Sequence, residues 1–285
     1  MKKRNLFSML VIVAGFTFLG TSCSTTESNV ATDAALTTTA TDEAQAASLS
    51  DVVINNADAN INTLAANGYT TPQAVKGTVD SSVMTITVDH PDSTYFPKII
   101  TIDYGTTGYV DARNDTLQGK MIITISNKLW KSGATKTIKL VDFYVNGNNI
   151  KGTKVITNNG LNADKQPSMT DVVSDTIIRV DKSTIIRNAT RTRTRISDNG
   201  TPKNTWDDEF SITGSSTGVN AKGVAYTVTI TNPLIIYNNY KFFVQGTITT
   251  TTQTRTATLD YGDGTKDNKA TLTINGVTKN ITLKN

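Results

Sequence analysis

Apolar and polar residues alternate with a period of two along most of the chain, from about residue 75 to the C-terminus. The alternation is clear in residues 83–88 and 242–249, where threonine accompanies valine and isoleucine. Half-buried strands have this pattern and favour these residue types. No later stretch is suited to a helical crossover between parallel strands. We therefore predict an all-β domain over residues 75–285, an antiparallel meander of about ten to thirteen strands forming a sandwich or a barrel-like roll.

Dipeptides that favour tight turns separate the predicted strands. They are Asn146-Gly147, Asn159-Gly160, Asn199-Gly200, Asp263-Gly264 and Asn275-Gly276. Such residues accept the positive φ angles of two-residue hairpin loops. With the last dipeptide at a turn, Ile274 would face Val277 and Leu272 would face Lys279. The face predicted to be dry holds Leu272, Ile274, Val277, Ile281 and Leu283. The other face is rich in threonine, so the register is well specified.

The N-terminus has the pattern of an export signal. Residues 2–4 are basic, and residues 6–19 form an apolar stretch that is too short for a stable membrane span. Residues 19–23 (LGTSC) resemble a bacterial lipobox, in which a signal peptidase cuts before a lipid-modified cysteine. We predict that residues 1–22 are a signal peptide and that Cys23 is the lipid attachment site.

Cys23 is the only cysteine of the chain and stands where this chemistry needs a thiol. Burial of acyl chains contributes about 0.8 kcal/mol per CH₂ group, and two or more chains hold a protein stably at a membrane. An ordinary secretory leader with an incidental cysteine is the alternative. By resemblance to enteric lipoproteins, in which aspartate after the cysteine marks inner-membrane retention, Ser24 indicates the outer membrane, on its periplasmic or cell-surface face.

Two segments link the cysteine to the β domain. Residues 23–47 are rich in serine, threonine, alanine and aspartate, a composition that cannot bury enough apolar surface to offset the entropy of ordering. We predict a lipidated flexible tether there. Residues 48–68 have a weak helical spacing that ends at Asn67-Gly68, a frequent helix C-terminus. We expect a short helix over this segment.

The composition limits the chemistry. Without the three basic residues of the leader, the 28 lysines and arginines become 25 against 24 acidic residues, too balanced for a broad nucleic-acid footprint. The single histidine, His90, lies beside a proline in a turn, and the single cysteine lies in the export signal. We therefore predict no disulfide framework, no metal site, no cofactor and no nucleic-acid partner.

Residues 260–267 resemble the Gly-Asp-Gly turn of PKD-type surface domains and carry Asp260, Asp263 and Asp267. Their spacing does not match the alternate ligand positions of a calcium loop. We interpret the segment as a tight turn that uses aspartate and glycine for backbone reasons.

Arg191, Arg193 and Arg195 alternate with threonine and so share one face of a strand. With a turn around residues 199–200, Arg193 would lie opposite Asp208, and such cross-strand pairs contribute up to about 1 kcal/mol. We predict a solvated face of paired charges. A site for anionic glycan or lipid headgroups is the alternative.

Acidic and aromatic residues could serve a sugar site. A glycosidase needs two carboxyl groups about 5–10 Å apart across a cleft. The available acids are Asp103, Asp207, Glu209 and Asp260, but acids near glycine and asparagine usually serve turns, and we predict no catalytic residue. The aromatic candidates are Tyr95, Tyr104, Tyr109, Trp130, Tyr144, Trp206, Tyr237 and Tyr240. Core packing is their alternative role; Trp130 is the best candidate, because residues 127–133 have the pattern of a loop.

Four stretches resemble an uncharacterised family of Gram-negative lipoproteins. They are residues 96–105 (FPKIITIDYG), 143–147 (FYVNG), 150–154 (IKGTK) and 259–270 (LDYGDGTKDNKA). The likeness covers most of residues 80–285. Members commonly carry a cysteine near the positions of Thr107 and Lys266, where this chain has none. The resemblance implies export, lipidation and an all-β domain, and it supplies no reaction, ligand or active site.

These features predict a membrane-anchored envelope lipoprotein, held at the bilayer by acylated Cys23, whose non-enzymatic β domain binds a glycan or envelope-protein partner or serves a structural role. Two alternatives remain open. A glycan-binding or glycan-processing surface lipoprotein would have an acidic cleft lined by Trp130 or Trp206. A lipid-carrier β-barrel would enclose a large dry cavity, and an interior packed by isoleucine and valine would count against it.

Overall fold

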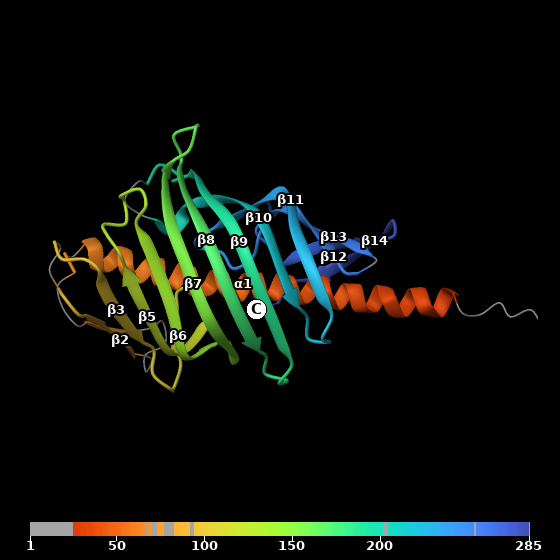
Figure 1. Ribbon diagram of the computed structural model, residues 1–285, viewed down its shortest axis with the longest axis horizontal. Coiled ribbons are helices and arrows are strands. Elements are labelled where there is room, and N and C mark those ends of the chain that lie inside the picture. Colours follow the sequence, from red (N-terminus) through yellow and green to blue (C-terminus); the bar gives the residue numbers. More distant parts are fainter. Residues whose placement is uncertain are drawn as a thin grey trace, which may run out of the picture.

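The computed structural model describes residues 25–66, 68–69, 73–76, 83–91, 94–201, 205–253 and 255–284. The predicted signal peptide and Cys23 lie outside these residues. The described part contains two helices and fifteen strands (Figure 1). The helices are α1 (Thr25–Ala66) and the short 3-10 helix η1 (Thr205–Asp207). The strands are β1 (Gln73–Lys76), β2 (Val83–Val88), β3 (Lys98–Asp103), β4 (Tyr109–Val110), β5 (Thr116–Ile125), β6 (Thr135–Val145), β7 (Asn148–Leu161), β8 (Pro167–Ile178), β9 (Thr184–Ser197), β10 (Glu209–Val219), β11 (Ala225–Tyr237), β12 (Gln245–Thr251), β13 (Thr256–Asp263), β14 (Lys269–Ile274) and β15 (Val277–Thr282).

All fifteen strands belong to one antiparallel sheet. Each strand pairs with the next along the chain, except that β3 pairs with β5 and the short β4 adds to β5. β1 and β15 are the two ends of the order, so the sheet is open. The predicted antiparallel meander is therefore confirmed. It forms one open, curved sheet rather than the predicted sandwich or a closed barrel.

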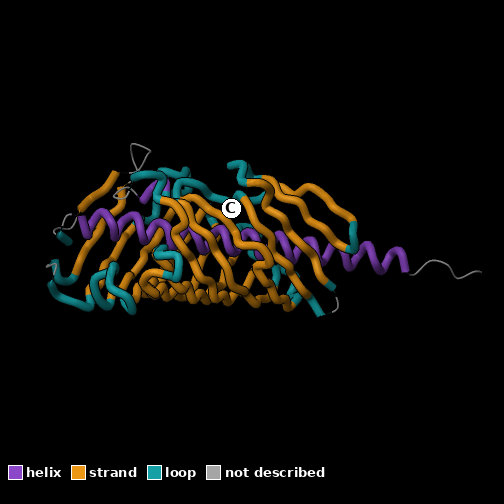
Figure 2. The backbone as a smooth tube through the Cα atoms, turned by 90° about the horizontal axis from the view of Figure 1, so that it is seen from above, coloured by secondary structure: helices purple, strands orange, loops and turns teal. Residues whose placement is uncertain are grey.

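α1 lies along the inner face of this sheet and crosses its strands (Figures 1 and 2). Near its start, Asp33 pairs with Arg255 beside β13 at 2.5 Å, and near its end Asn60 donates to the Tyr104 hydroxyl after β3 at 3.4 Å. A 42-residue helix is about 63 Å long at 1.5 Å per residue. Fourteen strands about 4.8 Å apart span about 62 Å. One helix is therefore long enough to serve the whole width of the sheet.

The predicted flexible tether is wrong for residues 33–47, which belong to α1 and are largely buried. The buried residues among them are Leu36, Thr39, Ala40, Asp42, Glu43, Ala44, Ala46 and Ala47. The predicted short helix over 48–68 is only the C-terminal part of this longer helix. The sheet curves around α1. In keeping with this, the helix carries small and polar residues on most sides and lacks the single apolar stripe that marks a surface helix. Packing against the sheet supplies the stability that its own sequence does not.

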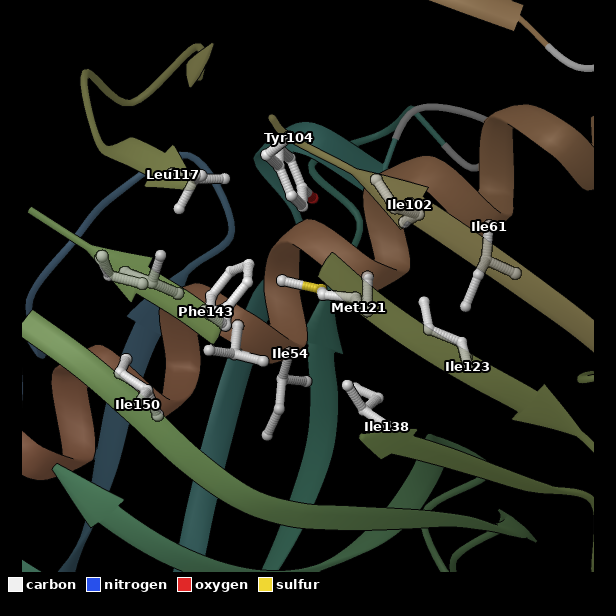
Figure 3. Close-up of a cluster of buried hydrophobic side chains, with 14 of the residues drawn as sticks. Ile54, Ile61, Ile102, Tyr104, Leu117, Met121, Ile123, Ile138, Phe143 and Ile150 are labelled. Atoms are coloured by element: carbon white, nitrogen blue, oxygen red, sulfur yellow. The ribbon is translucent and has the colours of Figure 1, made fainter. Parts of the chain in front are cut away.

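Large apolar side chains fill the space between α1 and the sheet in two clusters. The first surrounds Ile54 and Ile61 of α1, which point toward side chains of β3, β5, β6 and β7 (Figure 3). The second surrounds Leu36 and includes Phe210 and Tyr261 from the C-terminal half of the sheet. The interior of the curved sheet is therefore occupied by α1 and packed apolar side chains.

Glycines at irregular points of the strand pairing help the sheet to bend. The register shifts at Gly119 between β5 and β6 and at Gly246 between β12 and β13, where φ is +82° and +102°. A Cβ atom at Gly119 would lie 2.0 Å from the Asp142 carbonyl oxygen, so the neighbouring backbone would have to move. Such bulges bend and twist strands, and here they contribute to the curvature around α1.

The C-terminal hairpin has the predicted register. Ile274 pairs with Val277 and Leu272 with Lys279. Leu272 and Ile274 are buried as predicted, but Val277 is 72% exposed. Val277 is the first residue of β15, which is an edge strand of the open sheet, and its side chain is exposed to solvent there.

Two turn predictions had different outcomes. Asn146-Gly147 joins β6 to β7 with positive φ at both residues, as predicted. Asn159-Gly160 was predicted as a turn but lies within β7, where the register with β8 shifts. Gly160 has φ +84° there, so the dipeptide serves a bulge instead of a hairpin.

Candidate functional site

α1 leaves one polar strip partly uncovered near its C-terminal end. Asn55, Asp58 and Asn62 are three or four residues apart and therefore share one side of the helix. Asn62 is exposed and Asp58 is half-buried, whereas Ile54 and Ile61 are fully buried against the sheet. Asp58 and Asn62 can therefore meet a ligand, while Asn55, Ile54 and Ile61 are buried.

This strip forms the floor of a cleft made of two adjoining hollows of about 370 and 300 Å³. They share Asp58, Asn62, Thr205 and Asn238. Further residues of the first hollow include Asn55, Arg113 and Trp206. Those of the second include Trp130, Lys136, Asn158, Arg193, Arg195, Asp208 and Phe210. Each volume lies at the lower end of the range for small-molecule sites.

The two tryptophans of the chain both reach this cleft. Trp130 lies on the loop between β5 and β6, as predicted, and is 78% exposed. Trp206 lies in η1 and is 39% exposed, with the Arg113 guanidinium 5.9 Å from its ring centroid. The sequence proposed either residue as a sugar platform; the fold brings both to one cleft.

Three loops hold the wall that carries Trp206. Arg113 Nη1 donates to the Asn238 carbonyl oxygen at 3.0 Å, and Asn238 Nδ2 donates to the Thr205 carbonyl oxygen at 2.8 Å. Asn62 Nδ2 of α1 donates to the Thr205 hydroxyl at 3.3 Å. The loops before β5, β10 and β12 therefore converge on the end of α1, and the wall is preorganised.

Every charged group that lines the cleft has an opposite charge beside it. The pairs are Lys136 with Asp58, Arg195 with Asp208, Arg193 with Asp51 and Asp171, and Arg113 with Asp111. The Lys136 and Arg193 side chains are nearly fully buried, so their partners also offset the cost of burying charge. The cleft thus offers many hydrogen-bonding groups with balanced charge.

Asp208 has an unusual environment in this cleft. Its side chain is 3% exposed, and its Oδ1 atom has no hydrogen-bond partner among the described residues. Burial raises the pKa of the Asp208 carboxyl above its ordinary value, although Arg195, at 3.4 Å, acts in the opposite direction. A cleft carboxyl with a raised pKa can act as a proton donor to a bound ligand.

A belt of buried ion pairs lies behind the cleft and holds α1 against β9. Asp51 Oδ1 is 2.5 Å from Arg191 Nη2 and 3.0 Å from Arg193 Nη2. Farther along α1, Glu43 Oε1 is 2.8 Å from Arg187 Nε. Burial alone would raise the pKa of Asp51, but Arg191 and Arg193 hold it below its ordinary value. The charged form of Asp51 therefore stabilises the folded protein.

The belt corrects the interpretation of the alternating arginines. Arg191, Arg193 and Arg195 share one strand face as predicted, but that face points inward, and the first two are each 2% exposed. Arg193 lies opposite Ile212, not Asp208, because Arg195 pairs with Phe210 in the register of β9 and β10. The predicted solvated face is wrong because α1 supplies buried carboxylates.

The acids proposed from the sequence do not line the cleft. Asp103 pairs with Lys120 at 2.9 Å. Asp207 and Glu209 flank Asp208 in the chain without being part of the lining. Asp260 Oδ1 accepts a hydrogen bond from the Gly262 backbone nitrogen at 2.9 Å. The carboxylates of the cleft are Asp58 and Asp208 instead.

The Asp-Gly segment is a turn only in part, because residues 260–263 belong to β13 and residues 264–268 join β13 to β14. Asp263 Oδ1 accepts from the Thr265 backbone nitrogen at 3.1 Å, and Asp267 Oδ1 accepts from that of Lys269 at 2.9 Å. These carboxylates serve the local backbone. Across the described ranges, no group of three or more His, Cys, Asp or Glu side chains could hold a metal ion.

The aromatic candidates separate into two groups. Tyr104 is 1% exposed and belongs to the core, so it is not a platform. Tyr95 is 50% exposed but stacks on His90, with ring centroids 4.1 Å apart, and it does not line the cleft. Among the aromatic candidates from the sequence, Trp130 and Trp206 line the two hollows.

Sequence reasoning missed Asp58 and Asn62, and it considered Asp208 only as a cross-strand partner of Arg193. The helical spacing of Asn55, Asp58 and Asn62 was visible, and Asp208 is two residues from Trp206. Their convergence depends on how a helix crosses distant strands, which no local pattern contains.

No protein-family model, curated protein or solved structure matches this chain. Within the residues described, no helix is long and apolar enough to cross a membrane.

We expect Asp51→Asn and Asp208→Asn to have different effects on stability. Asparagine at position 51 leaves Arg191 and Arg193 buried with too little opposite charge, and the free energy of unfolding at pH 7 should fall by about 3–5 kcal/mol. Asparagine at position 208 removes a carboxylate whose charged form is disfavoured by burial, and the Arg195 side chain that it leaves is partly exposed to solvent. The free energy of unfolding should therefore change by no more than about 1 kcal/mol. Urea unfolding measures both.

The pH dependence should also differ. The lowered pKa of Asp51 means that its contribution is present above about pH 4 and is lost as the pH falls through the folded value. The raised pKa of Asp208 means that its contribution declines as the pH rises from about 4 through the folded value. Asp51→Asn should therefore flatten the loss of stability in acid. Equal losses in the two variants, or an unchanged acid profile for Asp51→Asn, would contradict the assignment.

Proposed function

We propose that this protein is a lipoprotein of the bacterial outer membrane, anchored through acylated Cys23, with a non-enzymatic β domain that binds a small polar ligand in the cleft beside α1. The anchor rests on the basic, apolar and lipobox-like segments of residues 1–23. The binding role rests on the cleft, which both tryptophans and a polar strip of α1 line.

The cleft has the properties of a binding site. Exposed indole rings offer flat apolar contact area at low cost in conformational entropy. Asparagine side chains and paired charges around them can orient a polar ligand. The loops that join Arg113, Asn238 and Thr205 keep one wall in place before the ligand arrives, and preorganisation of this kind favours affinity.

α1 would also set the distance between the cleft and the membrane. The helix begins at Thr25, two residues after Cys23. The stretch from Thr25 to Asp58 spans about 50 Å at 1.5 Å per residue. With lipid on Cys23, the cleft would stand near the far end of a rigid helix, where a ligand in the surrounding water can reach it.

A glycan-processing enzyme is the second candidate, and Asp208 is the observation that favours it. Its carboxyl lines the cleft, is buried and has a raised pKa, as a general acid requires. Asp58 is the other carboxylate of the lining. The lipid-carrier alternative has less support, because α1 and packed isoleucine and valine side chains occupy the interior of the sheet.

The anchor is tested by Cys23→Ala in cells. We expect the unchanged protein in the outer-membrane fraction and the variant in the soluble fraction, because the alanine cannot carry acyl chains. Ser24→Ala, which keeps the thiol, is the matched control and should stay with membranes. A Cys23→Ala protein that still pellets with membranes would contradict lipid anchoring.

The binding role is tested by tryptophan fluorescence. Because Trp130 and Trp206 are the only tryptophans of the chain, their emission reports on the cleft alone. We expect a saturable change in emission with at least one of three probe classes, namely neutral oligosaccharides, oligogalacturonate and palmitate, without release of new reducing ends. No response to any class would contradict the binding role. New reducing ends that disappear in Asp208→Asn would favour the enzyme instead.

A further inference from the structure

The chemistry of the cleft restricts the class of its ligand. The two platforms are Trp130, on the loop between β5 and β6, and Trp206, in η1, and they lie at the two adjoining hollows. A flat apolar face of a ligand can stack on each ring, since the face of an indole attracts the positively polarised hydrogens of C–H groups. A ligand that uses both rings needs at least two such faces.

The length of the cleft supports an extended ligand. Its floor follows α1 from Asn55 to Ala66, which is about 17 Å at 1.5 Å per residue. That length exceeds a single sugar ring and suits a short chain of them. Fatty acyl chains fit the first hollow less well, because its floor consists of Asp58, Asn62 and other polar or small residues. The second hollow also has apolar lining residues, which are Leu129, Ile156, Pro167, Met169 and Phe210.

The hydrogen-bonding groups suit hydroxyl groups. Asn62 is exposed and uses Nδ2 toward Thr205, and its amide has further donor and acceptor capacity. Asn238, at the junction of the two hollows, likewise places an amide beside the ligand. Primary amides both donate and accept, as sugar hydroxyls do.

The charges of the cleft argue against an acidic ligand. Lys136, Arg193 and Arg113 are buried beside carboxylates, and Arg195 faces Asp208. A ligand carboxylate or phosphate would have to compete with these internal acids for the same cations. A neutral ligand leaves every pair intact.

We propose that the cleft binds a neutral oligosaccharide, with one sugar ring stacked on Trp130 and another on Trp206. This proposal rests on the cleft being the binding site and adds the ligand class. The polar strip of α1 and the amide of Asn238 hold the hydroxyl groups between the two rings. The paired charges stay within the protein wall.

Calorimetric titration of the purified protein with maltoheptaose, cellohexaose, chitohexaose and mannohexaose tests the proposal. We expect at least one to bind, and Trp130→Ala and Trp206→Ala each to weaken it on the order of tenfold or more, as loss of a central aromatic contact does. Tyr95→Ala is the matched control, because it removes an exposed aromatic ring outside the cleft, and its affinity should stay unchanged. Urea unfolding of each variant checks that the fold is retained.

The other outcomes separate the two proposals. If oligogalacturonate or palmitate binds and none of the neutral sugars does, the ligand class is wrong and the binding role stands. If no class binds, the binding role fails with it. If a neutral sugar binds equally to the protein and to both tryptophan variants, stacking in this cleft is excluded. Circular dichroism shows whether a loss of binding comes from unfolding.

Discussion

The pairing of α1 carboxylates with buried arginines on β9 is the interaction on which the rest of the structure depends. Asp51 and Glu43 face Arg191, Arg193 and Arg187 between helix and sheet. Neither set could be buried alone, because an isolated charge in the interior is very costly. Together they fix where along the sheet the helix lies. Apolar clusters on both sides of this belt supply most of the burial, while the ion pairs specify the position.

The position of α1 along the sheet determines where the cleft forms. The sheet covers α1 closely from Leu36 to about Asn56 and then leaves the side with Asp58 and Asn62 open. Loops from three parts of the chain close around the helix end and bring Trp206 near the open strip. Trp130, on the β5–β6 loop, lines the second hollow. The proposed site is thus a product of the helix docking into the sheet.

The sequence predicted those parts of the fold that depend on local pattern. The period-two alternation led to the antiparallel meander, and the Asn275-Gly276 turn led to the correct register of the last hairpin. It failed for residues 33–47, because a helix enclosed by a sheet needs no apolar stripe. It failed for Arg193 because the charges that neutralise it come from Asp51 and Asp171 on other elements. Trp130 and Trp206 were recognised as candidates, but only the fold brings them to one cleft.

Hydrogen–deuterium exchange of the backbone amides in residues 34–47 tests the central claim, that α1 is a buried part of the fold along this segment, most directly. Helical amides that open only with the surrounding sheet exchange as slowly as the strands that hold them. We expect these amides to be protected to the same degree as those of β8 and β9. Complete exchange within seconds, at the rate of an unstructured peptide, would contradict it.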